Sequence, residues 1–224
     1  MKKNLVFAFS ICAACLSAGA QTVKWDSTYR PPVYNTRFDQ FNSYPHTSSD
    51  VVFLGNSITQ GTDWNELLQL PQARNRGISG DITFGVLQRL DEVIQGHPAK
   101  VFILIGINDI GRNIPDDVIL GNYEKIISRI QAGSPRTKIY FQTLMPVNNS
   151  FTQHPTHYNK DEHIAAVNDG LKKLGAQKHI TIIDIHPHFL DSDNRLDKKY
   201  TLDGLHLNAE GYKVWAQVLK PYLR

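Results

Sequence analysis

Residues 51–59 read Val-Val-Phe-Leu-Gly-Asn-Ser-Ile-Thr, and this stretch decides how the rest of the chain is interpreted. Its four leading apolar residues are mostly β-branched or aromatic, which is typical of a strand buried on both faces. The run stops at Gly55, and small polar residues follow at once. In open parallel sheets, ligands bind at the carboxyl ends of the strands. Ser57 is therefore a candidate nucleophile, although Gly-Asn-Ser is also an ordinary turn, and this stretch alone leaves both readings open.

Strand-like and helix-like segments alternate along the rest of the chain. Further strands are expected at residues 73–77, 101–105, 138–143 and 180–185. The crossovers of roughly 20–35 residues are typical of right-handed βαβ units. The sequence therefore predicts an α/β fold, a three-layer α/β/α sandwich with a five-stranded parallel sheet, flavodoxin-like in class.

Helices are expected at residues 36–42, 63–70, 82–94, 115–130, 160–174 and 208–221. Asp81 is the expected N-cap of the third helix, because Ile82, Val86 and Leu90 recur at helical spacing after it. Gly175 is expected to end the helix that begins near residue 160.

The first twenty residues have the pattern of a secretory signal peptide. Lys2 and Lys3 precede a mostly apolar run over residues 5–16, and Ala18-Gly19-Ala20 has the small residues of a cleavage site. The apolar run is too short for a permanent membrane anchor, and the residues before the cysteines fit a lipoprotein signal badly. We expect cleavage after Ala20 and an exported protein, periplasmic or extracellular, without stable membrane insertion.

Removal of residues 1–20 would leave 204 of the 224 residues, enough for one domain with a full core. Residues 21–50 lack a clear period and are expected to form a lead-in that packs on a domain spanning residues 51–224. Cys12 and Cys15 both lie in the leader. We therefore expect neither a disulfide nor a thiolate metal site in the mature chain.

The charge balance gives no indication of a polyanionic partner. Loss of Lys2 and Lys3 from the 24 basic residues would leave 22 against 21 acidic ones, a formal charge of +1. No block of basic residues stands out. Neither nucleic acid nor an anionic membrane surface is therefore expected as a partner.

Polar residues follow three of the expected strands in the same way. Ser57 follows the first, Gly80 follows the second, and Asn108 follows the third. Parallel strands bring these termini to one edge of the sheet. Asp203 and His206 stand three residues apart just before the last helix, so the carboxylate can fix the tautomer of the imidazole.

Together these residues are the parts of an acyl-transfer site. Ser57 is the predicted nucleophile, His206 the base that takes its proton, and Asp203 the group that orients His206. The Ser57 and Gly80 backbone N–H groups and the Asn108 amide are the predicted oxyanion hole. Singly, these residues could be a turn serine, a tight-turn glycine and a helix cap. The presence of Asp203 and His206 favours catalysis.

The four blocks Gly55–Thr59, Ile78–Asp81, Gly106–Asp109 and Asp203–His206 resemble, in order, those of the SGNH or GDSL-type hydrolases. Residues 75–81 and 203–208 are most similar to the branch that contains platelet-activating-factor acetylhydrolase catalytic subunits and bacterial carbohydrate acetylesterases. The resemblance implies the SGNH hydrolase fold and a serine esterase mechanism. Asn56 departs from the aspartate that the family name implies, which keeps a side-chain acceptor at the turn but loses the charge.

A histidine cluster is the main alternative signal, because His154, His157 and His163 could suggest a metal site. Their spacing has no matching carboxylate arrangement, so we interpret them as parts of a solvated loop and helix start. We expect no metal and no cofactor. Residues 55–61 lack the lysine and the ending of a phosphate-binding loop.

We expect a secreted serine esterase, monomeric or homodimeric, that hydrolyses short-chain esters. The expected substrates are O-acetyl groups on carbohydrates. No continuous apolar insertion suggests a lid or a long acyl channel. The loops expected to rim the site are polar and aromatic, which suits a sugar: Asp63, Trp64, Asn65, Asn148, Asn149, His154, His157 and Tyr158. The alternatives are a lysophospholipase or thioesterase on longer acyl chains, a binding protein that has lost catalysis, and a flavodoxin-type cofactor binder.

Overall fold

The structure is a computed structural model that describes residues 25–224, so the expected signal peptide and its cleavage after Ala20 lie outside the described residues. Within this range the chain forms a five-stranded sheet in the order β2-β1-β3-β4-β5, and every neighbouring pair is parallel. The predicted α/β fold with a five-stranded parallel sheet is confirmed.

The strands are β1 (Val51–Gly55), β2 (Ala73–Gly77), β3 (Lys100–Leu104), β4 (Lys138–Gln142) and β5 (Thr181–Ile183). The helices are α1 (Tyr34–Ser43), α2 (Ser57–Gln60), α3 (Trp64–Leu68), α4 (Thr83–Gln88), α5 (Leu90–Ile94), α6 (Ile107–Gly111), α7 (Asp116–Gly133), α8 (Asp161–Lys178) and α9 (Ala209–Leu219). Short 3₁₀ turns span His186–Phe189, Lys198–Tyr200 and Lys220–Tyr222.

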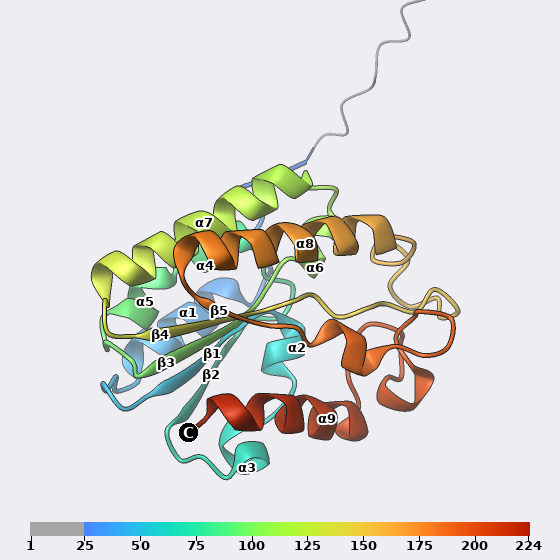
Figure 1. Ribbon diagram of the computed structural model, residues 1–224. Helices are drawn as coiled ribbons and strands as arrows, with labels where there is room; N and C mark the ends of the chain where they lie inside the picture. Colours follow the sequence, from blue (N-terminus) through green and yellow to red (C-terminus); the bar gives the residue numbers. More distant parts are fainter. Residues whose placement is uncertain (1–24) are drawn as a thin grey trace, which may run out of the picture.

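The sheet lies between two layers of helices. Figure 1 shows α7 and α8 on one face with α4 and α5 beside them, and α3 and α9 on the other. Aromatic side chains fill the interface between the sheet and the α3–α9 layer. Phe53 of β1 stacks on Trp64 of α3 with 4.1 Å between ring centres, and Trp64 meets Trp215 of α9 edge-on with 4.8 Å between ring centres. Large aromatic rings buried in this way dominate the energetics of a core.

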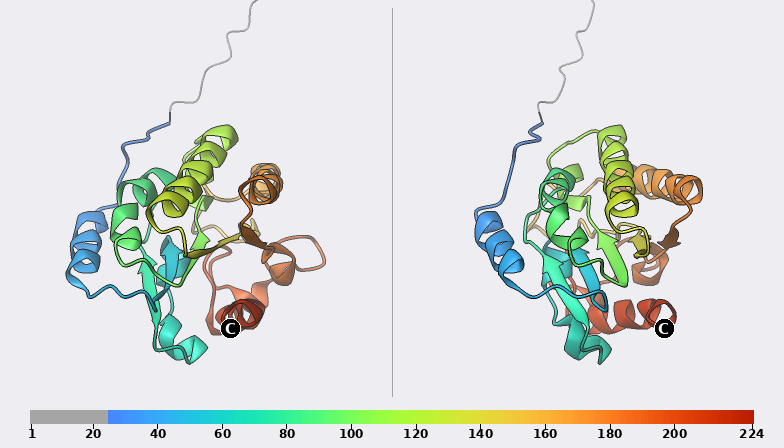
Figure 2. Two further views of the ribbon diagram at one scale, coloured as in Figure 1. Left: turned by 60° about the vertical axis from the view of Figure 1, so that its left-hand side comes forward. Right: turned by 90° about the vertical axis from the view of Figure 1, so that its left-hand side faces the viewer.

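The lead-in segment packs along the β2 edge of the sheet. Figure 2 shows α1 beside β2 and the α4–α5 region. Tyr34 of α1 is buried and donates a hydrogen bond to the Gly85 carbonyl at 2.7 Å. The Arg76 guanidinium of β2 lies 4.9 Å from the centre of the Phe41 ring. The helix therefore covers an edge strand that would otherwise expose unpaired backbone groups.

The expected single helix over residues 82–94 is wrong. The chain forms α4 and α5, which meet at Arg89, and the N-cap position belongs to Ile82 rather than Asp81. The Asp81 carboxylate instead accepts a hydrogen bond from Arg89 Nε at 2.9 Å, and both side chains are fully buried. The residue at which the two helices meet is therefore also the buried partner of Asp81.

The expected end of a helix at Gly175 is also wrong. Helix α8 continues through Gly175 to Lys178, and His179 closes it in a left-handed conformation. A Cβ atom on Gly175 would lie 2.3 Å from the Ile182 side chain. The glycine therefore allows α8 to approach β5 closely rather than ending the helix.

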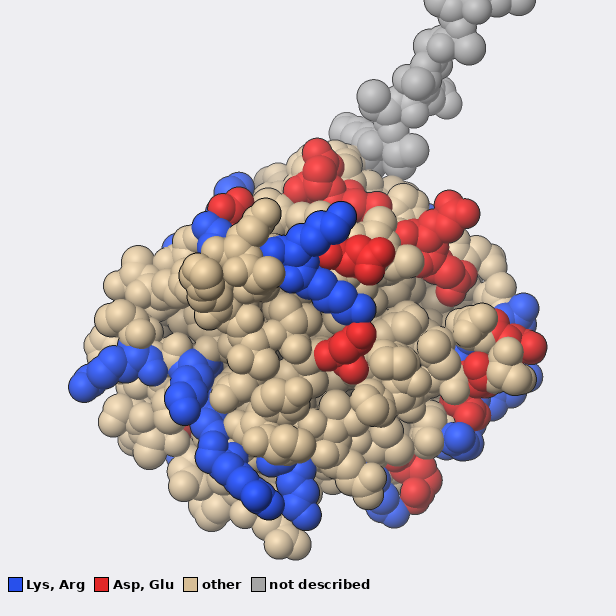
Figure 3. Space-filling view, in the orientation of Figure 1, with Lys and Arg blue, Asp and Glu red and all other residues tan. Residues whose placement is uncertain are grey.

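In the described part of the chain, helices that are both long and apolar enough to cross a bilayer do not occur. Acidic and basic side chains both appear on the face in Figure 3, with a run of basic ones over its lower left.

Candidate active site

Three strand ends place the predicted site residues on one edge of the sheet. Ser57 begins α2 directly after β1, Gly80 lies in the turn after β2, and Asn108 lies in α6 after β3. The loop before α9 carries Asp203 and His206 to the same place. The structure thus brings together the five residues that the sequence singles out.

Ser57, His206 and Asp203 form a continuous hydrogen-bonded chain. Ser57 Oγ lies 2.9 Å from His206 Nε2, and His206 Nδ1 lies 2.7 Å from Asp203 Oδ2. A carboxylate only accepts hydrogen bonds, so Nδ1 of the neutral imidazole carries the hydrogen and Nε2 is free to accept one from Ser57. This is the arrangement of a nucleophile, a general base and an orienting acid.

The Asp203 carboxylate is fixed by several donors. Its Oδ1 atom accepts from the backbone N–H groups of Leu205 at 3.0 Å and His206 at 2.8 Å. Burial alone would raise the pKa of Asp203, but the hydrogen bonds from the His206 side chain and from these backbone groups outweigh it and hold the pKa well below its usual range. Asp203 is therefore ionised wherever the protein is folded near neutral pH.

The predicted oxyanion donors keep hydrogens that no protein group accepts in the described part of the chain. Gly80 has a φ of 79°, a left-handed conformation that glycine adopts without strain. Within residues 25–224, the N–H groups of Ser57 and Gly80 donate to no protein acceptor. Asn108 Nδ2 uses one hydrogen on the Asp81 carbonyl at 2.9 Å and keeps a second. Three donors thus remain for an oxyanion.

Asn56 acts as the cap of α2. Its Oδ1 atom accepts from the Ile58 N–H at 3.0 Å, and the residue is buried. This contact uses the side-chain acceptor that asparagine shares with aspartate. The departure from the family aspartate therefore leaves the turn that presents Ser57 intact.

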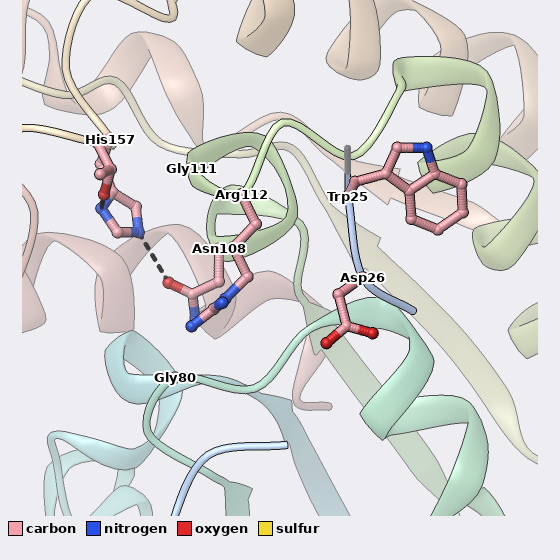
Figure 4. Close-up of a pocket in the computed structure, with 8 residues that line it drawn as sticks. Trp25, Asp26, Gly80, Asn108, Gly111, Arg112 and His157 are labelled. Carbon is pink, nitrogen blue, oxygen red and sulfur yellow. Dashed lines mark hydrogen bonds between the residues drawn. The ribbon is translucent and has the colours of Figure 1, made fainter. Parts of the chain in front are cut away.

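A cavity of about 430 Å³ opens beside the oxyanion donors. It is lined by Trp25, Asp26, Gly80, Asn108, Gly111, Arg112, Thr156 and His157, and Figure 4 shows how these side chains face it. The Arg112 guanidinium lies 3.1 Å from the centre of the Tyr29 ring. The lining combines polar and charged side chains with apolar surface, including one indole from the lead-in segment.

A second cavity, next to the turn that carries Ser57, is apolar and holds only about 10 Å³. Its lining comes from the ends of β1, β3 and the segment after β4: Asn56, Ile58, Leu104, Ile107, Leu144, Met145, Pro146, Val147 and Leu205. This space is about that of a single water molecule.

Part of the expected rim lies elsewhere. Trp64 is 1% exposed in the core, and Asn148 and Tyr158 are also buried. Asp63 accepts from the Asn65 N–H at 3.1 Å and caps α3. These residues pack in the core or cap a helix. The prediction that Trp64 and Tyr158 offer rings to a sugar is therefore wrong.

The sequence places His154 and His157 on the expected rim of the site but does not predict their contacts with the site residues. His154 Nε2 lies 3.0 Å from Asp203 Oδ2, and His157 Nε2 lies 3.0 Å from Asn108 Oδ1. Both lie in the loop before α8, as expected, but each is partly buried against a site residue, whereas His163 is exposed and pairs with Asp116. The three-residue spacing was visible, but nothing in it indicates these partners.

Among residues 25–224, one group of side chains could hold a metal ion. One ligand atom each from His154, Asp203 and His206 lies within 4.8 Å of the others. Two imidazoles and a carboxylate suit Zn²⁺. The same atoms already bond to one another, so an ion would have to replace the contacts that orient His206.

A family model described as the GDSL-like lipase/acylhydrolase family matches residues 53–214. Platelet-activating factor acetylhydrolase IB subunit alpha2 from Homo sapiens is 31% identical over 179 residues, which cover 77% of this chain and 73% of that protein.

Solved structures extend the likeness of fold. A GDSL-like lipase from Bacteroides thetaiotaomicron superposes with a TM-score of 0.74 at 23% identity, covering 85% of this chain and 96% of that one. An acetyl xylan esterase superposes with a TM-score of 0.66 at 23% identity, covering 78% and 100%.

Proposed function

Because the chain belongs to the GDSL-like lipase/acylhydrolase family and is an ester hydrolase, we propose that it removes short acyl groups, acetyl above all, from O-acylated saccharides. Ser57 is the nucleophile, His206 the general base and acid, and Asp203 the orienting carboxylate. The observation that carries this proposal is the unbroken contact from Ser57 Oγ through His206 to Asp203 beside free oxyanion donors.

The proposed reaction has two displacements. Ser57 Oγ attacks the ester carbon while its proton passes to His206 Nε2, and the carbonyl electron pair moves onto oxygen. When the pair returns, the bond to the alcohol oxygen breaks and His206 protonates that oxygen. Water then attacks the acyl-enzyme with the same help from His206, which releases the acid and restores Ser57.

The oxyanion forms against the N–H groups of Ser57 and Gly80 and the second hydrogen of Asn108 Nδ2. These donors stand in place before the substrate arrives, because the backbone turn and the Asp81 carbonyl hold them. Each such donor is typically worth ~2.7–4 kcal/mol of transition-state stabilisation.

The space around Ser57 supports a short acyl group. The apolar cavity at this turn holds about 10 Å³, far less than a long chain needs. Each methylene that a site buries contributes ~0.8 kcal/mol, so a long-chain enzyme requires a channel. The relative named an acetylhydrolase points to the same acyl group.

The alcohol part is proposed to occupy the cavity of about 430 Å³, a volume typical of small-molecule sites. Trp25 offers a ring for stacking, while Arg112 and Thr156 offer hydrogen bonds to hydroxyl groups. This support differs from the rim expected from the sequence, since the indole comes from the lead-in segment.

One observation favours a second candidate, a lysophospholipase or thioesterase on longer chains. Leu202, directly before Asp203, is 78% exposed and could meet an acyl chain that lies along the surface. The curated relatives include proteins named for platelet-activating factor.

A panel of esters tests the proposal. One arm varies acyl length from acetyl to octanoyl on one alcohol, and the other compares acetylated saccharides with lysophospholipids. We expect the highest kcat/KM with acetyl, a steep fall beyond butyryl and release of acetate from saccharides. Faster cleavage of octanoyl esters or lysophospholipids would replace the saccharide proposal with the second candidate.

The proposal also includes export after cleavage at Ala20. The support is the basic start, apolar run and small-residue ending of residues 1–20. N-terminal sequencing of the secreted protein should begin at Gln21. A chain retained in washed membranes with Met1 intact would contradict it.

A further inference from the structure

The loop between β4 and α8 is bound to the loop that carries the orienting acid. Asn148 N–H donates to the Gly204 carbonyl at 2.9 Å. The Tyr158 hydroxyl donates to the Asp203 carbonyl and accepts from the His154 N–H at 3.2 Å. These contacts hold the short stretch His154-Pro155-Thr156-His157 against the active site.

His154 shares an oxygen atom with His206. Asp203 Oδ2 accepts from His206 Nδ1 at 2.7 Å and from His154 Nε2 at 3.0 Å. The two rings meet nearly edge to face, 5.0 Å between centres. Because a carboxylate has no hydrogen to give, His154 must carry its hydrogen on Nε2. His154 thus helps to fix Oδ2, while the backbone N–H groups of Leu205 and His206 fix Oδ1.

His157 makes the corresponding contact with the oxyanion hole. Its Nε2 atom lies 3.0 Å from Asn108 Oδ1, and Thr156 Oγ1 donates to its Nδ1 at 3.2 Å. Burial, with the neighbouring charges of His154, His206 and Arg112, lowers the pKa of His157 to about 4. The ring is therefore neutral at physiological pH, with its hydrogen on Nε2.

The two partners of Asn108 decide which way its amide points. The Asp81 carbonyl can only accept, so it requires Nδ2, and the His157 N–H requires Oδ1. A reversed amide would place Oδ1 against the Asp81 carbonyl oxygen, so that two acceptors would face each other. It would also place Nδ2 against the His157 N–H, so that two donors would face each other. With the observed orientation, the second hydrogen of Nδ2 is the one left for the oxyanion.

Helix α6 leaves room for this contact. A Cβ atom on Gly111 would lie 2.9 Å from His157 Nε2, so only glycine lets the ring reach Asn108 from this side. Figure 4 shows His157 directed at the Asn108 amide.

We propose that His154 and His157 are positioning residues for ester hydrolysis, His154 acting through Asp203 and His157 through Asn108. One loop segment thereby sets both the orienting acid and the oxyanion donor. This inference rests on the proposed function, since it assigns roles through residues that the function uses. Neither histidine is required to touch the substrate or to transfer a proton.

Both histidines use Nε2, which permits a matched pair of substitutions. Glutamine places its amide nitrogen near the position of Nε2, whereas asparagine reaches only as far as Nδ1. We expect His154→Asn and His157→Asn to lower kcat by ~10- to 100-fold with little change in KM, because misplaced catalytic groups cost turnover rather than binding. His154→Gln and His157→Gln should recover most of the loss.

Double mutants test the route of each effect. Asn108→Ala should lower kcat by ~10²- to 10³-fold, and His157→Asn should add little in that background. His154→Asn should likewise add little to Asp203→Asn. His163→Asn is the control, because His163 lies at the start of α8 and bonds Asp116 instead.

The outcomes separate the inference from the function. If Asn108→Ala and Asp203→Asn leave ester hydrolysis intact, the proposed function is wrong. If those variants are impaired but the histidine effects are absent or multiply fully with them, the positioning roles are wrong. Equal losses in the Gln and Asn variants, with unchanged circular dichroism, would also overturn the inference, because the position of the donor would then not matter.

Discussion

The side-chain amide of Asn108 rests on the backbone carbonyl of Asp81, with Nδ2 and the oxygen 2.9 Å apart. The contact joins the segment after β3 to the turn after β2, which carries Gly80. Below it, the buried Asp81 carboxylate pairs with Arg89, and Arg89 Nη2 donates to the Gly55 carbonyl at 3.0 Å. The oxyanion hole is therefore built on a buried ion pair that also touches the end of β1.

Replacing Arg89 should destabilise the protein. Arg89→Met leaves the buried Asp81 carboxylate without its partner, and breaking such a pair from one side costs ~3–5 kcal/mol. Urea unfolding at pH 7 measures the loss. Asp81→Asn combined with Arg89→Met should recover part of it, because no uncompensated charge remains. A loss below ~1 kcal/mol in the single variant would contradict this account.

Asp109 predicts a pH dependence of stability. Burial raises the pKa of its carboxyl to about 7, against hydrogen bonds from Thr83 that lower it. The folded state therefore keeps a proton that the unfolded chain releases near the ordinary value of 3.8. This contribution to stability is fully present below that value and is lost as the pH rises to about 7.

Asp109→Asn cannot lose a proton and should remove this dependence. Its free energy of unfolding should rise relative to the unmodified protein by up to ~1.4 kcal/mol per pH unit between pH 4 and 7, and then level off. Denaturant titrations at several pH values measure the difference, whatever its constant offset. Parallel curves for the two proteins would show that Asp109 does not titrate in this window.

The strand ends are the part of the site that sequence reasoning predicts well. Continuous apolar runs mark buried parallel strands, and their carboxyl ends must share one edge. Ser57 and Asn108 follow from that rule, whereas Gly80 follows a short strand, Ala73–Gly77, that has no continuous apolar run. Asp203 and His206 follow from their local spacing, since residues three apart in one turn can touch.

The remaining parts depend on contacts that leave no local pattern. Arg89 looks like any polar position on a helix, yet its side chain is buried against Asp81 at the point where α4 ends. His154 reaches Asp203 across 49 positions of sequence. Trp64 follows a helix cap at a polar turn, but its ring is buried in the core, where it stacks on Phe53. Tertiary packing decides each of these cases.

Ser57→Ala and His206→Ala should each lower kcat by at least ~10³-fold, because the members of such a triad act as a unit. The double variant should be little worse than either single one. Hydrolysis of an acetyl ester by the purified proteins measures this. Ser49→Ala and His163→Ala are matched controls on exposed residues. Multiplying losses in the double variant would mean that the two residues do not cooperate.

Zinc should inhibit the enzyme, whereas chelators should not. Zn²⁺ prefers imidazole and carboxylate ligands, and His154, Asp203 and His206 offer such atoms within 4.8 Å of one another. An ion there would replace the hydrogen bond between Asp203 and His206 that orients the general base, so turnover should fall. Because the ligands must give up protons, inhibition should strengthen as the pH rises.

His154→Gln removes one of these ligands while keeping a donor to Asp203. Relative to its own rate without metal, this variant should need a higher zinc concentration for half-inhibition than the unmodified protein does. His163→Gln, which leaves the cluster whole, should respond like the unmodified protein. EDTA should leave the rate of the untreated enzyme unchanged, since the proposed steps use only protons and oxygen nucleophiles. A loss with EDTA that zinc reverses would instead mean that the ion belongs to the working site.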